Sequence, residues 1–389
     1  MKSVCNYASN RHKFFLVAIL SISLLLTGCG SNTDTTQSGV IKIGQVSPLT
    51  GNIAHLGKDN ENGVRLAIEE VNAESLKIGG KLVTFELVSE DDEAKPLKST
   101  IVAQKLVDRG VVGVIGHLNS GTTIPASKIY SDAGIPQISP SATNVNYTKQ
   151  GFKTAFRVIA NDAQQGRVLG SFAAKLVAKK IGVIDDRTDY GKGLAEEFEK
   201  AAKNSGSEIV THEFTDNTKT DFTAILTRIK SMNADLIFFS GMDAQAGPMM
   251  KQIKNLGMDV LFLTGDGGQT KQFLTLAGDQ AEGAFASSPG EPLSKMVGGD
   301  VFTKKYEERF GQSIQIYAPY AYDATQALIR AIVDADSTDP QIYLPKLAEI
   351  EYDGVTGPVS FDEKGDIKRG TISLYQVKNG QWTYLETLQ

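Results

Sequence analysis

The sequence predicts an α/β protein built from two open parallel-sheet lobes that are joined by a multi-strand hinge. Short apolar segments alternate with longer segments in which apolar residues recur every three or four positions, and this alternation favours βαβ units on a parallel sheet. The alternation runs through the first part of the chain, breaks off near residue 160 and starts again. A chain of 389 residues is also long enough for about two domains.

The first run of elements lies between residues 41 and 139. The segment 111–116 (VVGVIG) is apolar throughout, which is typical of a strand buried on both faces. Pro96 marks a helix start, because proline is favoured in the first helical turn. Strands are predicted at 41–47, 82–88, 111–116 and 136–139, and helices at 57–72, 96–108 and 125–132.

The second run repeats the pattern between residues 164 and 264. A strand at 284–287 is then expected to return the chain toward the first lobe. We expect lobe 1 to comprise residues 40–160 plus 289–370, and lobe 2 to comprise residues 161–288 plus 371–389. Helices are predicted at 164–179, 193–204, 222–232, 244–256, 302–310, 320–334 and 343–351, and strands at 181–185, 208–214, 235–240, 260–264, 371–378 and 382–385.

Residues 1–28 predict a lipoprotein signal peptide. Arg11 and Lys13 precede an apolar run at 14–26 that is shorter than the roughly 20 residues a membrane span needs. The sequence Leu-Thr-Gly-Cys that ends at Cys29 resembles the bacterial lipobox, in which the cysteine is lipidated and becomes the first mature residue. The alternative is a plain signal peptide with a chance cysteine. We expect an exported protein that is anchored to the membrane through Cys29, with residues 29–39 as a flexible tether.

Charge and composition exclude several classes of partner. Residues 1–28 carry three basic residues and no acid, which leaves 37 Lys and Arg against 45 Asp and Glu, a net charge of about −8. This balance argues against a nucleic-acid partner. The other cysteine, Cys5, lies in the signal peptide, so the mature chain has no thiol pair for a disulfide. The scattered histidines His55, His117 and His212 do not suggest a metal site, and we expect neither a metal nor a cofactor.

Common catalytic motifs are missing from the sequence. The chain contains no G-x-S-x-G, G-x-x-x-x-G-K-[ST] or G-x-G-x-x-G, and His212-Glu213 lacks the second histidine of H-E-x-x-H. An enzyme, for example an amidase, is therefore the least favoured reading, and we predict a protein without catalytic activity.

Polar loops follow several predicted strands. The loop 117–123 follows the buried strand, the loop 139–144 (SPSATN) follows the next one, and Asp266 follows the strand at 260–264. In open α/β sheets the ligand crevice lies at the carboxyl ends of the strands. Hydroxyls beside a helix start can bind an anion, with ordinary N-capping as the alternative. For Asp266 the alternative is a simple Asp-Gly turn.

From about residue 41 to residue 368 the chain resembles the leucine/isoleucine/valine-binding proteins, which are type I periplasmic binding proteins. The resemblance implies a clam-shell fold and a role as the substrate-binding protein of an ABC importer. Its partners would be a small amino acid and the ABC permease subunits, and we expect a monomer. The matching blocks are Val114–Leu118, Pro125–Ser127, Ser139–Thr143, Tyr190–Leu194, Gly357-Pro358 and Phe361–Asp366.

The resemblance also implies a site for an amino-acid zwitterion. Ser120 matches the serine that holds the α-carboxylate, and Thr143 matches the threonine that meets both carboxylate and ammonium. Ser141 stands where a backbone carbonyl accepts from the ammonium. Asp266 stands where the aliphatic binders place a glutamate opposite the ammonium, and we expect it to face solvent in the ligand-free cleft. Tyr190 matches an aromatic wall from the second lobe.

The rest of the expected site would surround the ligand side chain. Leu56 replaces a tyrosine of the aliphatic binders, so the resemblance alone leaves the side-chain preference open. We predict binding of neutral L-amino acids, branched-chain or other aliphatic ones first. The expected set is completed by Leu56, Leu118, Asn119, Ala142, Met242 and Tyr317.

A ligand-sensing receptor for amino acids or small amides is the main alternative. The sequence shows no second membrane span or signalling module after the domain, and we take this to favour a carrier over a sensor.

Overall fold

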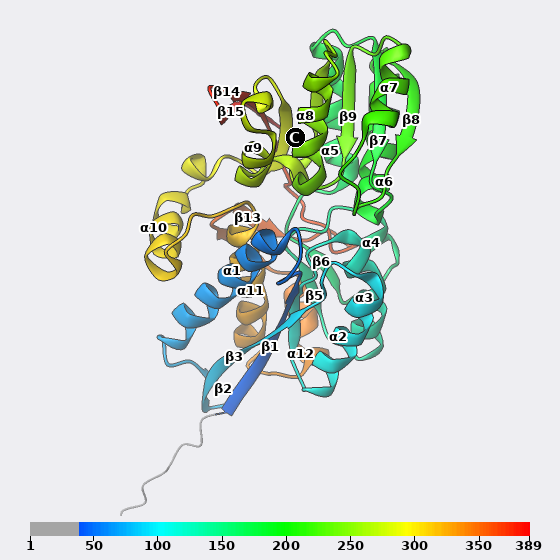
Figure 1. Cartoon of the computed structure of the whole chain (residues 1–389). Helices are drawn as coiled ribbons and strands as arrows, with labels where there is room; N and C mark the ends of the chain where they lie inside the picture. Colours follow the sequence, from blue (N-terminus) through cyan, green and yellow to red (C-terminus); the bar gives the residue numbers. More distant parts are fainter. Residues whose placement is uncertain (1–38) are drawn as a thin grey trace, which may run out of the picture. The chain divides into compact units, whose positions relative to one another are not determined.

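The computed structural model describes residues 39–389 and contains two large sheets, each flanked by helices (Figure 1). The first sheet, the centre of lobe 1, has the order β2-β3-β1-β4-β5-β6. Its neighbours pair in parallel, except for the short β2 against β3. The strands are β1 (Gly39–Ser47), β2 (Lys77–Ile78), β3 (Lys81–Asp91), β4 (Gly113–Gly116), β5 (Gln137–Ser139) and β6 (Ala155–Arg157).

Helices cover both faces of this first sheet. On β4, Val114 packs with residues of α2 and α3, whereas Ile115 packs with residues of α1 and α11. Because successive side chains of a strand point to opposite faces, this explains the continuous apolar run of the segment. The helices of lobe 1 are α1 (Ala54–Asn72), α2 (Pro96–Asp108), α3 (Ser120–Asp132), α4 (Asn146–Lys149), α10 (Gly299–Phe310), α11 (Ala318–Asp334) and α12 (Pro340–Ala348).

The second sheet, the centre of lobe 2, has the order β15-β14-β11-β10-β9-β7-β8. It is parallel from β11 to β8, and β14 and β15 add an antiparallel edge. Its strands are β7 (Lys180–Asp185), β8 (Glu208–Phe214), β9 (Leu236–Ser240), β10 (Leu261–Thr264), β11 (Phe285–Pro289), β14 (Ile372–Lys378) and β15 (Gln381–Leu388), and its helices are α5 (Asp162–Lys175), α6 (Asp189–Asn204), α7 (Thr223–Ser231), α8 (Asp243–Asn255) and α9 (Lys271–Ala277).

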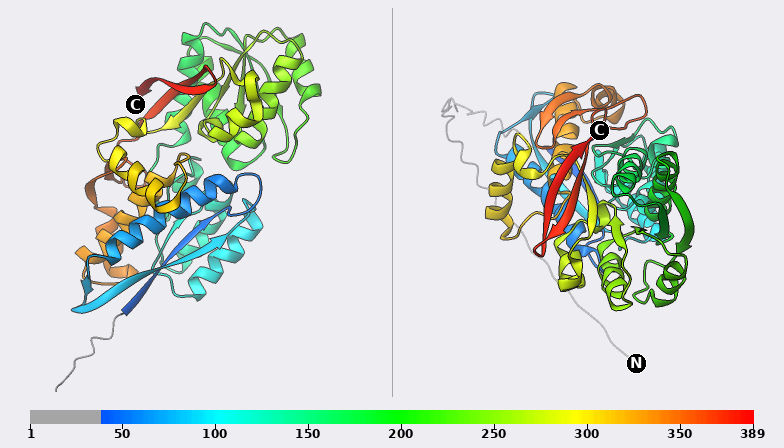
Figure 2. Two further views of the ribbon diagram at one scale, coloured as in Figure 1. Left: turned by 60° about the vertical axis from the view of Figure 1, so that its left-hand side comes forward. Right: turned by 90° about the horizontal axis from the view of Figure 1, so that it is seen from above.

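The chain passes between the two lobes three times, between β6 and α5, after β11 and before β14 (Figure 2). The strand predicted at 284–287 is β11. It lies within the second sheet, and the chain returns to lobe 1 only after it. Three one-turn 3-10 helices, Asp266–Gly268, Gly278–Ala281 and Leu293–Lys295, and the hairpin β12 (Glu351–Gly354) and β13 (Gly357–Ser360) complete the fold.

Most helices begin one to five residues earlier than predicted, and the two with the largest differences carry expected site residues. α3 begins at Ser120 rather than Pro125, and α6 begins at Asp189 rather than Gly193. The Thr188 hydroxyl caps α6 by accepting from the Gly191 N–H at 3.0 Å, a contact that the sequence pattern does not reveal. Ser120 and Tyr190 therefore lie in first helical turns, just beyond the ends of β4 and β7.

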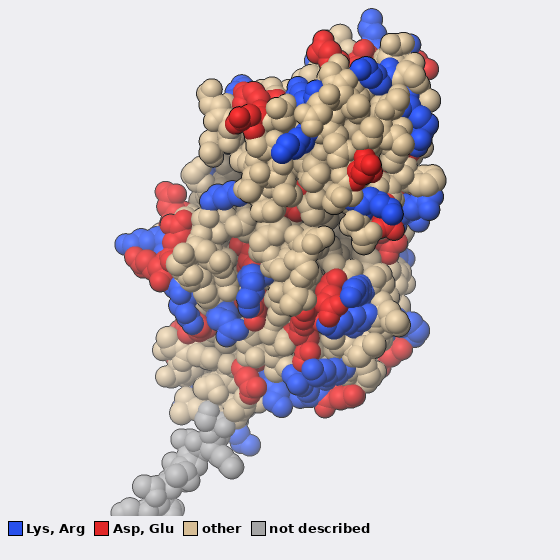
Figure 3. Space-filling model, in the orientation of Figure 1, with Lys and Arg blue, Asp and Glu red and all other residues tan. Residues whose placement is uncertain are grey.

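The predicted signal peptide, the predicted lipid attachment at Cys29 and most of the predicted tether lie outside the described residues. Between residues 39 and 389, no helix combines the length and the hydropathy needed to cross a membrane. Figure 3 shows Lys and Arg side chains intermixed with Asp and Glu over the displayed face of both lobes, rather than gathered by sign.

Candidate functional site

The carboxyl ends of the parallel strands of both lobes meet around a small cavity. From lobe 1 the ends of β4 and β5 lead into the polar loops, and from lobe 2 the ends of β7, β9 and β10 lead to Tyr190, Met242 and Asp266. The cavity has a volume of only about 10 Å³. It is lined by eight of the eleven predicted ligand-binding residues, namely Leu118, Asn119, Ser120, Ser141, Tyr190, Met242, Asp266 and Tyr317.

The lobe 1 side of the cavity presents a helix start and two cross-linked loops. Ser120 is the first residue of α3, and its hydroxyl accepts from the Asn144 N–H at 3.2 Å. The Ser141 hydroxyl donates to the Leu118 carbonyl at 2.9 Å. These bonds fix the two loops to one another. Free N–H groups at a helix start attract an anion, so this wall suits a carboxylate.

Thr143 lies directly behind this wall and is 1 % exposed. Its hydroxyl lies beside the Asp162 carboxyl and stabilises the charged form of that group. The side-chain oxygen of Asn119, in the cavity lining, has no hydrogen-bond partner among the residues that the structure describes. Because most buried polar atoms in proteins are hydrogen-bonded, this orphaned oxygen is an indication of a polar ligand.

Asp266 is the acid of the opposite wall, and it is buried rather than solvent-facing as predicted. It is 1 % exposed. One carboxylate oxygen accepts from the Tyr190 hydroxyl at 2.8 Å, and the other accepts from the Tyr317 hydroxyl of lobe 1 at 2.7 Å. Burial, together with the nearby Asp266 charge, raises the pKa of both tyrosines well above the usual value. Both tyrosines therefore stay protonated and act as donors.

A second acid, Asp162, was not predicted as a site residue, because an Asp at the start of a helix is usually interpreted as a capping residue. It is the first residue of α5, it is fully buried, and its N–H donates to the Thr143 carbonyl at 2.8 Å. Within residues 39–389, the Thr143 hydroxyl is the one group that bonds to its carboxyl. Desolvation by burial raises the pKa of Asp162 to about 8, the Thr143 contact acts against this shift, and the Asp266 charge acts with it.

Two other predicted residues lie behind the cavity lining. Leu56 is fully buried in an apolar cluster with Leu118 and Tyr317, beside Met242. Both backbone polar groups of Ala142 are hydrogen-bonded. Its N–H donates to the Ser139 hydroxyl at 2.9 Å, and its carbonyl accepts from Arg157 at 3.0 Å. Leu56 and Ala142 thus support the residues in the lining.

The lobes also touch on either side of the cavity. His55 of lobe 1 lies 2.7 Å from the Asp243 carboxylate of lobe 2, and the Asn144 amide donates to the Asp189 carbonyl at 2.5 Å. The Tyr317–Asp266 bond and a bond at 2.5 Å from the Lys271 ammonium of lobe 2 to the Ser313 hydroxyl of lobe 1 also join the lobes. Among residues 39–389, no group of three or more His, Cys, Asp or Glu side chains is arranged to hold a metal ion.

Comparisons with known proteins agree with this arrangement. Residues 40–381 match the family described as periplasmic binding protein. Leu/Ile/Val-binding protein homolog 1 of Brucella abortus is 33% identical over 351 residues, 89% of this chain and 93% of the relative. A leucine-, isoleucine-, valine-, threonine- and alanine-binding protein of Pseudomonas aeruginosa is 33% identical over 341 residues, 86% of this chain and 89% of the relative.

A solved structure is similar over nearly the whole described chain. It is the branched-chain amino acid transporter substrate-binding protein LivJ of Streptococcus pneumoniae, in complex with isoleucine. The TM-score is 0.81 at 30% sequence identity, over 90% of this chain and 99% of that chain.

Proposed function

The chain belongs to the periplasmic binding protein family, and from this we propose that it is the extracytoplasmic substrate-binding protein of an ABC importer. In this proposal it captures a small neutral L-amino acid, branched-chain or otherwise aliphatic, by closure of the two lobes. The observation that carries the proposal is the cavity between the lobes, with hydroxyls and a helix start on one wall and the buried Asp266 on the other.

The polar end of the cleft suits a zwitterion. The Ser120 N–H and hydroxyl would hold the ligand carboxylate together with Thr143. The ammonium would be bound by Asp266, the Ser141 carbonyl and the Thr143 hydroxyl, with Asp162 as a second acid behind them. A zwitterion is buried at acceptable free energy only when both of its charges are hydrogen-bonded.

The two tyrosine bonds to Asp266 are compatible with an ammonium at the same carboxylate. A carboxylate offers about four lone-pair sites, two on each oxygen. Tyr190 and Tyr317 use one site on each oxygen. The ligand can therefore share Asp266 with both tyrosines, and the Tyr317 bond across the cleft then favours the closed form.

The side-chain end of the cleft is apolar. Leu118, Met242 and the rings of Tyr190 and Tyr317 line it, Leu56 packs behind it, and Asn119 and Ala142 complete the surroundings. An uncharged aliphatic side chain matches these walls. The names of the relatives point the same way, since they include leucine, isoleucine, valine, threonine and alanine.

Anchoring and delivery complete the proposal. Residues 1–28 would be removed, Cys29 would carry the lipid, and residues 29–39 would tether the two lobes with the borders given above. The closed protein would act as a monomer that docks on the permease subunits. In this family a binding protein, not an enzyme, is expected. If full-length protein partitions into the aqueous phase of a detergent extraction, and Cys29→Ser behaves identically, the lipid anchor is wrong.

A ligand screen tests the central claim. Purified protein lacking residues 1–28 is screened by thermal shift against the proteinogenic amino acids, small amides and short organic acids, and hits are titrated by calorimetry. We expect the largest shifts with L-leucine, L-isoleucine and L-valine. Binding of a sugar, an amide or an organic acid, with none of any amino acid, would refute the proposal.

A further inference from the structure

The block Phe361–Asp366 that matches the family in sequence lies away from the cavity and forms a turn beside the hinge. The Asp362 side chain accepts from the N–H groups of Lys364 at 2.8 Å and Asp366 at 3.0 Å, which closes the turn. Gly365 has a φ of +90°, and a Cβ there would come within 2.0 Å of the Ala155 carbonyl. The turn thus packs closely against β6, and the Asp366 side chain lies beside the end of β6 and the residues that follow it.

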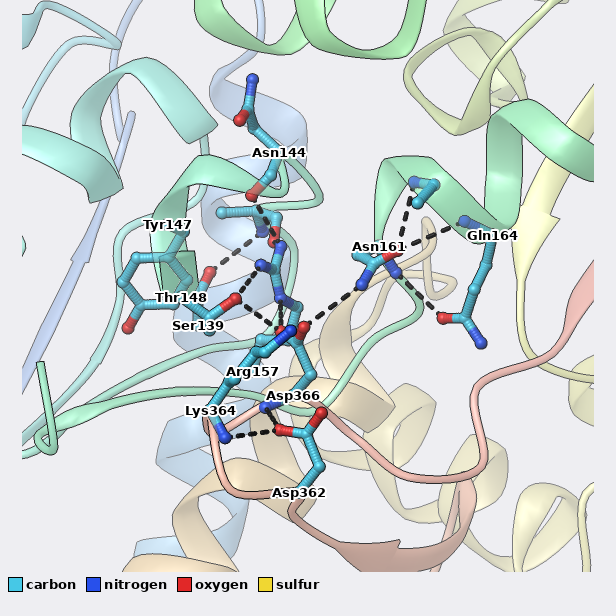
Figure 4. Close-up of polar contacts among 12 residues, drawn as sticks. Ser139, Asn144, Tyr147, Thr148, Arg157, Asn161, Gln164, Asp362, Lys364 and Asp366 are labelled. Carbon is cyan, nitrogen blue, oxygen red and sulfur yellow. Dashed lines mark hydrogen bonds and ion pairs between the residues drawn. The ribbon is translucent and has the colours of Figure 1, made fainter. Parts of the chain in front are cut away.

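Arg157, at the end of β6, connects this turn to the loop of the candidate site (Figure 4). The guanidinium is fully buried. Its Nε donates to Asp366 at 2.5 Å. One terminal nitrogen donates to the carbonyls of Ala142 at 3.0 Å and Asn144 at 2.9 Å, and the other donates to the Thr148 hydroxyl at 2.8 Å. Both carbonyls belong to residues 141–144, which we call the binding loop.

Asp366 reaches lobe 2 with its other oxygen. That oxygen accepts from the Asn161 amide at 3.2 Å (Figure 4). Asn161 is the N-cap of α5, where its side chain accepts from the N–H groups of Ala163 at 3.1 Å and Gln164 at 3.2 Å. Because the following residue, Asp162, donates to the Thr143 carbonyl at 2.8 Å, the start of lobe 2 is bonded to the binding loop by two routes.

We propose that Arg157 and Asp366 are positioning residues for ligand binding, because they fix the binding loop relative to the first helix of lobe 2. This inference rests on the proposed function. With Thr148 and Asn161 they form a group that we call the hinge network. The hinge network holds the binding loop so that the Thr143 hydroxyl and the Ser141 carbonyl lie where the ligand ammonium would bind. It touches no ligand itself.

Arg157→Lys separates positioning from general stability. Lysine keeps a positive charge beside Asp366, but a single ammonium on a flexible stem cannot reproduce the planar fork that reaches both loop carbonyls. Asp323→Asn is the matched control. Asp323 is a fully buried carboxylate of lobe 1 that accepts from the N–H groups of Val355 at 2.9 Å and Thr356 at 2.8 Å, at a turn outside the cavity lining.

Calorimetric titrations with L-leucine, L-isoleucine and L-valine, beside urea unfolding of each variant, test the inference. Arg157→Lys should lower the affinity for all three about tenfold, and by the same factor within about twofold, because the network acts on the shared polar end. Asp323→Asn should lose at least as much stability and keep its affinity within about twofold. If Arg157→Lys does not fold, Thr148→Val takes its place, with a smaller loss of the same kind.

Two results would overturn the inference while leaving the proposed function intact. One is an Arg157→Lys or Thr148→Val protein that binds L-leucine as tightly as the unsubstituted chain. The other is an affinity loss that simply follows the stability loss across all variants, Asp323→Asn included. If the unsubstituted protein binds no amino acid, the proposed function fails first, and the inference falls with it.

Discussion

The cleft and the hinge network are both buried and polar, and they share the binding loop, but they differ in how their polar groups are satisfied. In the hinge network each guanidinium nitrogen of Arg157 and each oxygen of Asp366 has a protein partner. In the cleft, the Asn119 side-chain oxygen has no partner among residues 39–389, and the Asp162 carboxyl has none there besides the Thr143 hydroxyl.

This difference separates the part of the molecule that is complete by itself from the part that is completed by a ligand. A fully bonded network holds its geometry, whereas unpartnered buried groups reduce stability and remain available for binding. Substitutions in the hinge network should therefore reduce the free energy of unfolding. Substitutions in the cleft should change affinity and leave stability unchanged or raised.

The largest expected effect lies in the hinge network. Arg157→Met leaves Asp366 without its cation and the Ala142 carbonyl without a donor, and the Asn144 carbonyl keeps only the Tyr147 N–H. Removing one partner of a buried ion pair costs about 3–5 kcal/mol, and urea unfolding followed by circular dichroism measures it. A loss below about 1 kcal/mol would show that this network is no more essential than a surface ion pair, and the comparison would fail.

Asp266→Asn is the corresponding test of the cleft. The ligand ammonium would be buried without its counter-charge, which typically costs about 2–5 kcal/mol, or roughly 30-fold to several-thousand-fold in affinity. Stability should stay within about 1 kcal/mol, because an amide can still accept from one tyrosine and donate to the other. Calorimetry with L-leucine measures the change, with Asp323→Asn as control. An unchanged affinity would return Asp266 to the role of a turn residue.

Local patterns predicted most of the longer elements of the fold, because local chemistry decides them, but they did not predict β2, β6, α4, α9 or the hairpin of β12 and β13. The helix at Pro96–Asp108 and the strand at Glu208–Phe214 have the predicted bounds. Helix starts were predicted less well. Polar first turns at Ser120 and Asp189 resemble loops until their capping contacts are seen.

The site was only partly predictable, because its decisive contacts join residues far apart in the sequence. The resemblance to a known family placed Tyr190, Tyr317 and Asp266 near the ligand, but no pattern indicated that both tyrosines bond to this acid. Likewise, Arg157 and Asp366 lie 209 residues apart. The sequence therefore identified the block around Asp366 but not its contact with Arg157. Asp162 was missed because its burial depends on the packing of lobe 2 against the binding loop.

Asp162→Asn should raise the free energy of unfolding, whereas Arg157→Met in the hinge network should lower it. The carboxyl ionises near pH 3.8 in the unfolded chain but only near pH 8 in the folded one. The folded state therefore binds the extra proton between these values, and stability falls as pH rises from about 4 to about 8. Asn resembles the protonated acid and removes this dependence, so the gain at pH 7 should be on the order of 4 kcal/mol, vanishing near pH 4. A variant that is less stable at pH 7 would contradict the assignment.

The cleft and the hinge can also be compared through two similar tyrosines, one in each region. Tyr317 and Tyr320 stand one turn apart at the start of α11, and both are buried. The Tyr317 hydroxyl reaches lobe 2, and the Tyr320 hydroxyl reaches the end of β11, where the chain crosses between the lobes. Tyr317 donates to Asp266 across the cleft at 2.7 Å, and Tyr320 donates to the Pro289 carbonyl at the hinge at 2.8 Å.

Tyr320→Phe removes one neutral hydrogen bond, worth about 0.5–1.5 kcal/mol, whereas Tyr317→Phe removes a hydrogen bond to a carboxylate, worth about 1.5–3 kcal/mol. Tyr317→Phe should lower the affinity for L-leucine about 12- to 160-fold, because the closed form loses a contact that the open form does not make. Tyr320→Phe should lower the free energy of unfolding by about 0.5–1.5 kcal/mol and leave affinity unchanged, since the hinge contact persists in both forms. Titration and urea unfolding of both variants distinguish the regions. Equal affinity losses would mean that Tyr320 also responds to closure, and that the hinge is part of the binding mechanism rather than its fixed support.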